Sequence, residues 1–312
     1  MKYTLSAPAK TFLLGEYLVL KGGPALLVNT SPRFQMEIQS FGEEGYCQGI
    51  HPHSPAGRWV RQERELFSQN QVSFKDPYEG KGGLGASSAQ FLMVYLWQKM
   101  VQSPVLNWQK EVFDWKTLWQ DYRSLHEDGQ SDKSWMPSGA DVVSQFMGKV
   151  CLLELPKKAQ TFSWPFSDLG FFLLRTGNKQ KTHEHLQHLE EDIRVSRLEQ
   201  IFRQTERAWF SQNVEDFCAG VTEYGCTLDA MGLLLPESKE WGLQIQKLDG
   251  VKAVKGCGAL GADTLVCFFE TEKRESLKSL MPLPIIASDQ DISEGVAFQS
   301  QFLNQEEGQG VS

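Results

Sequence analysis

The sequence predicts an α+β protein, and three observations lead to that prediction. Residues 2–10 and 33–41 alternate between apolar and polar side chains, which indicates strands of a half-buried sheet. The segment 87–102 is apolar and follows small and polar residues that can begin a helix. The short apolar run 171–177 indicates a buried strand in the second half. Both kinds of element therefore occur in a chain long enough to build a sizeable core.

The other predicted elements follow in chain order. The apolar run 11–28 is interrupted by two glycine-containing turns, so it predicts a strand, a turn and a second strand. Residues 42–82 are polar with scattered proline and glycine, and we expect them to be irregular. Further helices are predicted over 109–127, within 129–148, and over 180–210, 213–232 and 237–247, and further strands over 149–155, 251–255 and 264–269.

Composition and charge exclude several classes of protein. The chain has 312 residues, of which 41% are hydrophobic and 22% charged, as in globular proteins. Its formal net charge is −8, so a nucleic acid is not an expected partner. No segment has the apolar length needed to span a bilayer, so a membrane is not an expected partner either. The six cysteines contain no C-x-x-C pair, and there is no signal-peptide pattern, which together predict reduced thiols in a cytoplasmic protein. A change of composition near 160–170 predicts two domains, 1–165 and 166–312.

Residues 80–91, GKGGLGASSAQF, place four glycines and two serines directly before a predicted helix. Such a run is either a turn with Ser87 or Ser88 as the helix N-cap, or a loop whose N–H groups bind a phosphate. A dinucleotide-binding loop would follow a clear strand, but the preceding VSFKDPYE contains Pro77 and is predicted to be a poor strand. The Walker pattern and the H-R-D loop of protein kinases are absent.

Two further segments favour the phosphate-binding interpretation. SAPAKTFLLGEY (6–17) places Lys10 between an Ala-Pro-Ala turn and a Gly-Glu pair, and KGCGALGAD (255–263) is a second small-residue loop before an apolar strand. With GLGASSA (83–89), these segments resemble the three signature motifs of the GHMP kinase superfamily, which includes galactokinase, homoserine kinase, mevalonate kinase and phosphomevalonate kinase. The motifs are short, but their order and their spread along the chain both match.

The resemblance implies an ATP-dependent phosphotransferase with a two-subdomain GHMP kinase fold. Its N-terminal part would be ribosomal protein S5-like and bind ATP, and its C-terminal part would be ferredoxin-like. The residues expected to bind ATP are Gly83, Leu84, Gly85, Ala86, Ser87 and Ser88. Ala86 stands where the superfamily usually has its first serine, so Ser87 is the expected Mg²⁺ ligand. Leu260 and Ala262 replace glycines of the third motif and leave less room for backbone near a ligand.

The acceptor is expected to be a small acidic molecule of the mevalonate pathway. PSGAD (137–141) resembles the S-G-x-D segment of mevalonate and phosphomevalonate kinases. Glu16-Tyr17, Asp263 and the cationic run 175–182 favour phosphomevalonate. Mevalonate kinase and diphosphomevalonate decarboxylase are the alternatives, and a non-catalytic ligand sensor is the alternative of a different class. The implied substrate-binding residues are Glu16, Tyr17, Ser138, Gly139, Arg175, Lys179, Gly258, Ala259 and Gly261.

Asp141 and Lys10 are the catalytic residues that the resemblance implies. Asp141 would accept or orient the proton of the substrate hydroxyl, and Lys10 would keep it ionised and stabilise the transferring group. Considered alone, Asp141 would be a helix N-cap and Lys10 a solvated lysine at a strand end. Glu127 is the second expected Mg²⁺ ligand, with Asp128 as its competitor, although alone it would be an exposed acid at a helix end. A homodimer is left open.

Overall fold

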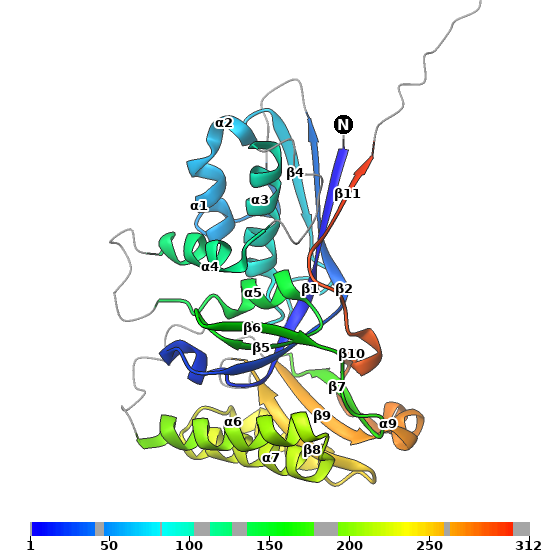
Figure 1. Cartoon of the computed structure of the whole chain (residues 1–312). Coiled ribbons are helices and arrows are strands. Elements are labelled where there is room, and N and C mark those ends of the chain that lie inside the picture. The colour runs from blue at the N-terminus through cyan, green and yellow to red at the C-terminus, as the bar shows by residue number, and fades with distance from the viewer. Residues whose placement is uncertain are drawn as a thin grey trace, which may run out of the picture.

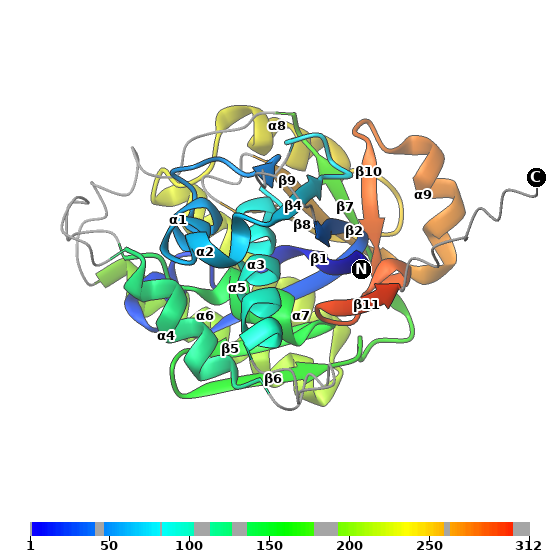
Figure 2. The same cartoon turned by 90° about the horizontal axis from the view of Figure 1, so that it is seen from above.

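The computed structural model describes residues 2–40, 47–81, 83–102, 113–126, 136–177, 193–258 and 263–301, which form two sheets with helices around them (Figure 1). The first sheet has the order β11-β1-β2-β4-β3, and β5 and β6 extend it from β2. Its strands are β1 Lys2–Leu14, β2 Ala25–Ser40, β3 Cys47–Gln48, β4 Asn70–Lys75, β5 Val150–Glu154, β6 Lys158–Phe162 and β11 Ala297–Gln301. The late strand β11 pairs antiparallel with residues 2–6 of β1 (Figure 2).

Helices from the first half of the chain pack against this sheet. They are α1 Pro55–Gln62, α2 Arg64–Phe67, α3 Ala86–Gln102, α4 Trp115–Ser124 and α5 Ala140–Met147. Residues 91–97 of α3, FLMVYLW, are all buried, because this helix lies between the sheet and the other helices. The core on this face joins Phe91 and Leu92 of α3 to Phe34 and Val72 of the sheet. The glycine-rich segment GKGGLG (80–85), called the glycine loop below, is therefore attached to one of the most buried helices of the chain.

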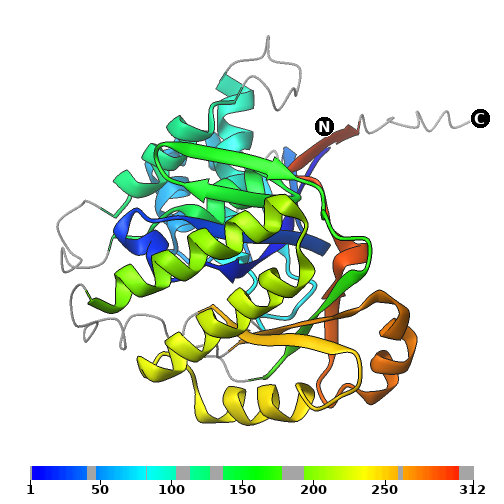
Figure 3. The same ribbon diagram turned by 60° about the horizontal axis from the view of Figure 1, so that its bottom comes forward.

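The second sheet has the order β10-β7-β9-β8 and is antiparallel between its described strands. Its strands are β7 Leu169–Arg175, β8 Val251–Cys257, β9 Thr264–Glu270 and β10 Ile285–Ser288. The helices α6 Ile193–Ser211 and α7 Val214–Ala230 lie side by side between the two sheets, as Figure 3 shows. The opposite face is covered by α8 Pro236–Ile245 and α9 Arg274–Leu280. Short 3-10 helices are η1 Leu18–Lys21, η5 Thr271–Lys273 and η6 Asp289–Asp291.

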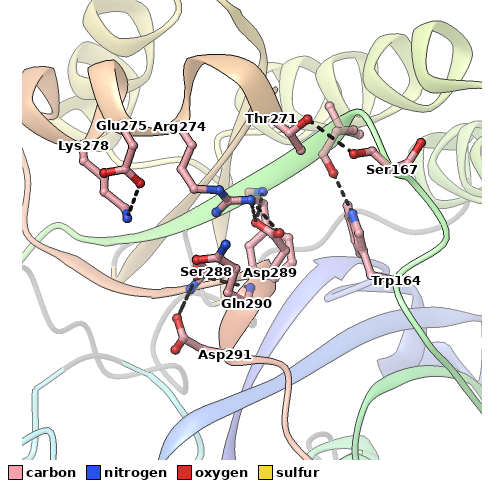
Figure 4. A network of polar contacts seen from close by, with 12 residues as sticks. Trp164, Ser167, Thr271, Arg274, Glu275, Lys278, Ser288, Asp289, Gln290 and Asp291 are labelled. Atoms are coloured by element: carbon pink, nitrogen blue, oxygen red, sulfur yellow. Dashed lines mark hydrogen bonds and ion pairs between the residues drawn. The ribbon is translucent and has the colours of Figure 1, made fainter.

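Two arginines fix the segment that runs from the second sheet back to β11. Arg274 of α9 donates to both oxygens of Asp289, at 2.9 and 2.7 Å, and the same carboxylate accepts the backbone N–H of Phe171 at 3.0 Å (Figure 4). Arg33 of β2 donates at 2.7 Å to three oxygens of residues 293–295. Arg33 thus ties this segment to the first sheet, while Asp289, held by Arg274, ties it to β7 of the second sheet.

The predicted α+β class is confirmed, and so are the elements with the strongest local pattern. The helix α3, the helix α7 and the strand β9 agree with their predicted ranges to within two residues. No described helix is both long and apolar enough to cross a membrane. All six cysteines are free, and four of them are buried.

The prediction of an irregular region over 42–82 is wrong for the residues described there. This region contains α1, α2 and β4. Pairing with β2 stabilises β4, and Pro77 lies beyond the end of the strand, where it removes no ladder hydrogen bond. The first strand is predicted over residues 2–10, but it continues to Leu14. Its register with β2 shifts between Ala7 and Ala9, as expected where proline has no N–H to donate.

Candidate active site

The strand β1 places Lys10 in the interior beside the glycine loop. On one edge, β11 pairs with β1 only as far as Ser6, which leaves the following residues of that edge available to another segment. The N–H of Lys10 donates to the carbonyl of Leu84 at 3.0 Å, so the glycine loop takes that place. The side chain of Lys10 is only 7% exposed. A buried ammonium group is costly unless it has a hydrogen-bonded or charged partner.

That partner is Asp141, which the short helix α5 carries in its first turn. Its Oδ2 lies 3.0 Å from Nζ of Lys10, and its side chain is 37% exposed, so the carboxylate faces both the lysine and solvent. Gly139 precedes the helix with a φ of 75°, and a side chain there would overlap the ring of Trp119. Trp119 also donates from Nε1 to the carbonyl of Ser138 at 2.7 Å. The Ser138-Gly139 turn is thus held from one side while Asp141 remains accessible.

The glycine loop leads directly into α3, which begins at Ala86. Both serines therefore lie in the first helical turn, and the prediction that one of them is the N-cap is wrong. Ser88 is buried and its hydroxyl donates to the carbonyl of Gly85 at 2.9 Å. Ser87 is exposed. A helix N-terminus with an exposed hydroxyl suits an anion or a hydrated cation, so Ser87 is the better placed of the two for such a ligand.

The third motif meets the glycine loop through Asp263. A side chain on Gly83 would overlap Oδ2 of Asp263, so the two residues are in direct contact. The carbonyl of Asp263 accepts the N–H of Thr176 at 3.3 Å, which adds the end of β7 to the same place. Gly258 follows β8 with a φ of 81°, a conformation that favours glycine. Ala259 and Gly261 lie outside the described residues.

Glu16 and Tyr17 are buried below this surface. The carboxylate of Glu16 forms an ion pair with Lys255 of β8, and the two side chains are 4% and 0% exposed. Tyr17 is 5% exposed and belongs to the core between the sheets. The resemblance implies that both residues bind substrate, but neither side chain reaches the protein surface in this structure. Their position instead joins the first motif to the third from inside the protein.

Arg175 lies at the end of β7, near the approach to the glycine loop. Burial is the main cause that raises the pKa of Tyr78, and the positive charge of Arg175 opposes that rise. Nε of Arg175 is buried without a hydrogen-bond partner among the described residues. Lys179 and Glu127 lie outside the described residues, and the described part of the chain contains no cluster of three or more His, Cys, Asp or Glu that could hold a metal ion.

Sequence reasoning missed three residues that shape the site: Gln145, Trp119 and Lys255. Gln145 of α5 donates from Nε2 to the carbonyl of Pro8 at 2.8 Å and to that of Gly85 at 3.1 Å. Trp119 lies in the predicted helix 109–127, and its contact with the turn before Asp141 depends on how α4 lies against α5. Lys255 had been matched to the third motif without a role. A signal existed only for Lys255, since a lysine inside an apolar strand needs a partner.

Comparison with known proteins identifies the fold. No protein-family model matches the chain, and no curated protein matches it in sequence. Among solved structures, galactokinase from Lactococcus lactis in complex with galactose superposes with a TM-score of 0.74 at 11% identity, covering 95% of each chain. Phosphomevalonate kinase from Streptococcus pneumoniae, in complex with phosphomevalonate and AMPPNP, gives 0.71 at 14% identity, covering 91% of this chain and 98% of that chain. The chain has the GHMP kinase fold.

Mevalonate kinase from Methanococcus jannaschii extends this likeness, with a TM-score of 0.68 at 14% identity over 93% of this chain and 98% of that chain.

Within this GHMP kinase fold, the three motif segments recognised in the sequence come together at one place. Leu84 accepts from Lys10, Gly83 contacts Asp263, and Lys255 pairs with Glu16. The candidate site is the surface above these contacts, between the glycine loop and Asp141.

Proposed function

We propose that the protein is an ATP-dependent kinase that transfers the γ-phosphoryl group to a small acidic acceptor, with 5-phosphomevalonate preferred over mevalonate. The contact between Lys10 and Asp141 at 3.0 Å, beside the glycine loop, carries this proposal. It pairs a buried cation with a partly exposed carboxylate next to a helix N-terminus, which is what phosphoryl transfer to a hydroxyl requires. The motif resemblance and the shared GHMP kinase fold support the same reaction.

In this reaction, the acceptor hydroxyl oxygen forms a bond to the γ-phosphorus while the bond between that phosphorus and the bridging oxygen of ADP breaks. Asp141 accepts or orients the hydroxyl proton. Lys10 pairs with Asp141 at 3.0 Å and stabilises negative charge on the transferring group. The N–H groups of residues 83–88 and the positive end of α3 bind the phosphates of ATP.

The donors at the start of α3 are compatible with Mg²⁺. Ser87 offers an exposed hydroxyl, whereas the hydroxyl of Ser88 is directed to the carbonyl of Gly85. Mg²⁺ keeps most of its waters and needs only one or two protein oxygens, so Ser87 with Glu127 is the proposed pair. The ion would neutralise the charge of the phosphates.

Arg175 supports an acceptor or nucleotide that carries an additional anionic group. Its buried Nε has no hydrogen-bond partner among the described residues, and an unsatisfied buried N–H of a guanidinium is costly. The residue as a whole is partly exposed, so a phosphate or carboxylate would pair with its guanidinium charge at the accessible atoms. On a protein with a net charge of −8, such a local cation is needed to hold an anionic ligand.

The test is release of ADP from ATP and Mg²⁺ with mevalonate, 5-phosphomevalonate, 5-diphosphomevalonate, homoserine and galactose as acceptors. Turnover with 5-phosphomevalonate and no release of CO₂ is expected. Asp141→Asn should lower kcat by about 100-fold or more while ATP affinity changes little, because the carboxylate acts on the acceptor proton. Turnover that survives Asp141→Asn, or ATP binding without turnover on any acceptor, contradicts the proposal, and the second outcome favours a ligand sensor.

A further inference from the structure

Gln145 connects the three segments that build the candidate site. Gln145 lies one helical turn after Asp141 on α5, and it is fully buried, with an exposed fraction of 0%. Its Nε2 donates to the carbonyl of Pro8 in β1 at 2.8 Å and to the carbonyl of Gly85 in the glycine loop at 3.1 Å. Both partners are carbonyl oxygens, which only accept, so the amide nitrogen and not the oxygen must face them. One side chain therefore joins the helix of Asp141 to the strand of Lys10 and to the glycine loop.

Each of the two carbonyls is suited to this contact. Pro8 lies at the register shift between β1 and β2, where the strand ladder is interrupted and a carbonyl can accept from a side chain. Gly85 has a φ of 90°, and a side chain there would come within 2.9 Å of both Nε2 of Gln145 and Cγ of Lys10. The loop backbone thus packs directly on the amide of Gln145 and on the stem of Lys10.

Resting on the proposed function, we propose that Gln145 is a positioning residue that sets the distance between the glycine loop and the pair of Lys10 and Asp141. Phosphoryl transfer depends on alignment more than on covalent help, and a displacement of about 1 Å can lower a rate by about 100-fold. The two N–H groups of one amide hold the loop and β1 against α5. The γ-phosphate bound by the loop then meets Asp141 and Lys10 in line.

The main variant is Gln145→Met, which keeps the length of the side chain and removes both donors. Its matched control is Gln98→Met, because Gln98 is also a buried glutamine in a helix, 3% exposed, and the hydrogen bond that it donates goes to Gln102 of the same helix at 2.8 Å. We expect Gln145→Met to lower kcat by about 10- to 100-fold with a smaller change in KM for ATP. Its melting temperature should lie within about 3 °C of that of Gln98→Met.

Amide hydrogen exchange without any ligand gives a readout that does not depend on activity. The N–H of Lys10 donates to Leu84, and the N–H of Ala89 donates to Gly85 at 2.9 Å, so both report whether the loop is held. Protection of these two amides should fall about tenfold or more in Gln145→Met and remain unchanged in Gln98→Met. Equal protection of both amides in the two variants overturns the proposal.

A second variant, Gln145→Glu, tests the need for a donor at this position. At neutral pH a carboxylate would face two carbonyl oxygens, whereas the protonated acid can donate one hydrogen bond, so its activity relative to wild type should rise as the pH falls from about 8 to 6. A ratio independent of pH contradicts the proposal. If the wild-type protein releases no ADP with any acceptor, the proposed function fails, while the exchange experiment still decides the role of Gln145.

Discussion

At the scale of single residues, two of the glycines in the glycine loop have similar φ angles but different surroundings. Gly80 has a φ of 73° and Gly85 a φ of 90°. A side chain on Gly80 would meet nothing within 4 Å, whereas one on Gly85 would come within 2.9 Å of Gln145 and of Lys10. Comparing alanine at the two positions therefore separates the cost of the backbone angle from the cost of moving the site.

We expect Gly80→Ala to lower the free energy of unfolding by about 1 kcal/mol, the ordinary cost of a positive φ in a residue with a Cβ. Gly85→Ala should cost more, about 2–3 kcal/mol, because the loop must also shift. It should weaken binding of a non-hydrolysable ATP analogue by more than about tenfold, against less than about threefold for Gly80→Ala. Urea unfolding and calorimetric titration measure these effects, and equal ATP affinities would show that Gly85 does not shape ATP binding by the glycine loop.

Residue by residue, a local motif marks the candidate positions Lys10, Asp141 and Ser87. The structure places Lys10 against Asp141 and beside the glycine loop that leads to Ser87. The sequence did not allow prediction of the burial of Glu16 or the contacts of Gln145. Those depend on partners far away in the chain: Glu16 pairs with Lys255, and Gln145 reaches Pro8 across 137 positions. A single sequence carries no record of such long-range contacts.

At the scale of elements, long segments with one dominant pattern were predictable, and short segments stabilised by neighbours were not. The helix α3 combines an apolar run with small residues at its start, so local chemistry alone identifies it. The strand β4 reads NQVSFK, with only two apolar residues, and it exists because it pairs with β2. The hairpin strand β6 likewise pairs along its length with β5 and was not predicted.

One ion pair joins the helix α6 to the strand β5, and it leads to a prediction about how the stability depends on pH. Arg203 of α6 donates to Glu154 of β5 at 2.9 Å, and this hydrogen bond is the main cause that holds the pKa of Glu154 below its usual value of 4.5. A carboxyl with a lowered pKa in the folded state contributes stability above its unfolded pKa and loses that contribution as the pH falls. The pair is partly exposed, so its contribution is expected to be about 0.5–1 kcal/mol.

Glu154→Gln should therefore lower the free energy of unfolding by about 0.5–1 kcal/mol at pH 7. Its difference from wild type should shrink as the pH falls below 4.5, because the wild-type carboxyl then becomes neutral as well. Urea unfolding followed from pH 7 downward measures this difference. The control is Glu275→Gln. Glu275 pairs with Lys278, and the side chain of Glu275 is 80% exposed. A difference that stays constant over this range would exclude ionisation of Glu154 as its source.

At the scale of the whole molecule, the two sheets are joined by apolar packing and by one buried ion pair close to the site. The helices α6 and α7 fill the space between the sheets with residues such as Phe202 and Phe217. Glu16, which follows β1, and Lys255 of β8 form an ion pair across the same space. Burial alone would lower the pKa of Lys255, but the carboxylate of Glu16 opposes this and the net pKa is raised. The lysine therefore remains charged at neutral pH.

Breaking this pair should be costly, whereas replacing both partners should recover much of the loss. Lys255→Met leaves a carboxylate buried without its partner and is expected to lower the free energy of unfolding by about 3–5 kcal/mol at pH 7. Glu16→Gln should have a similar cost, and the double variant should lose less than the sum by about 2–3 kcal/mol. The same cycle with Lys278→Met and Glu275→Gln, an exposed pair, should give a coupling below about 0.5 kcal/mol.

The raised pKa of Lys255 also fixes the conditions for this measurement. A lysine whose pKa is higher in the folded state than in the unfolded chain stabilises the fold at lower pH and loses that effect as the pH rises through its folded value. Urea unfolding at pH 7 therefore measures the full coupling. Because Lys255 belongs to the second sheet and Glu16 follows the strand that carries Lys10, a coupling near zero would mean that packing by α6 and α7 alone sets how the two halves meet at the site.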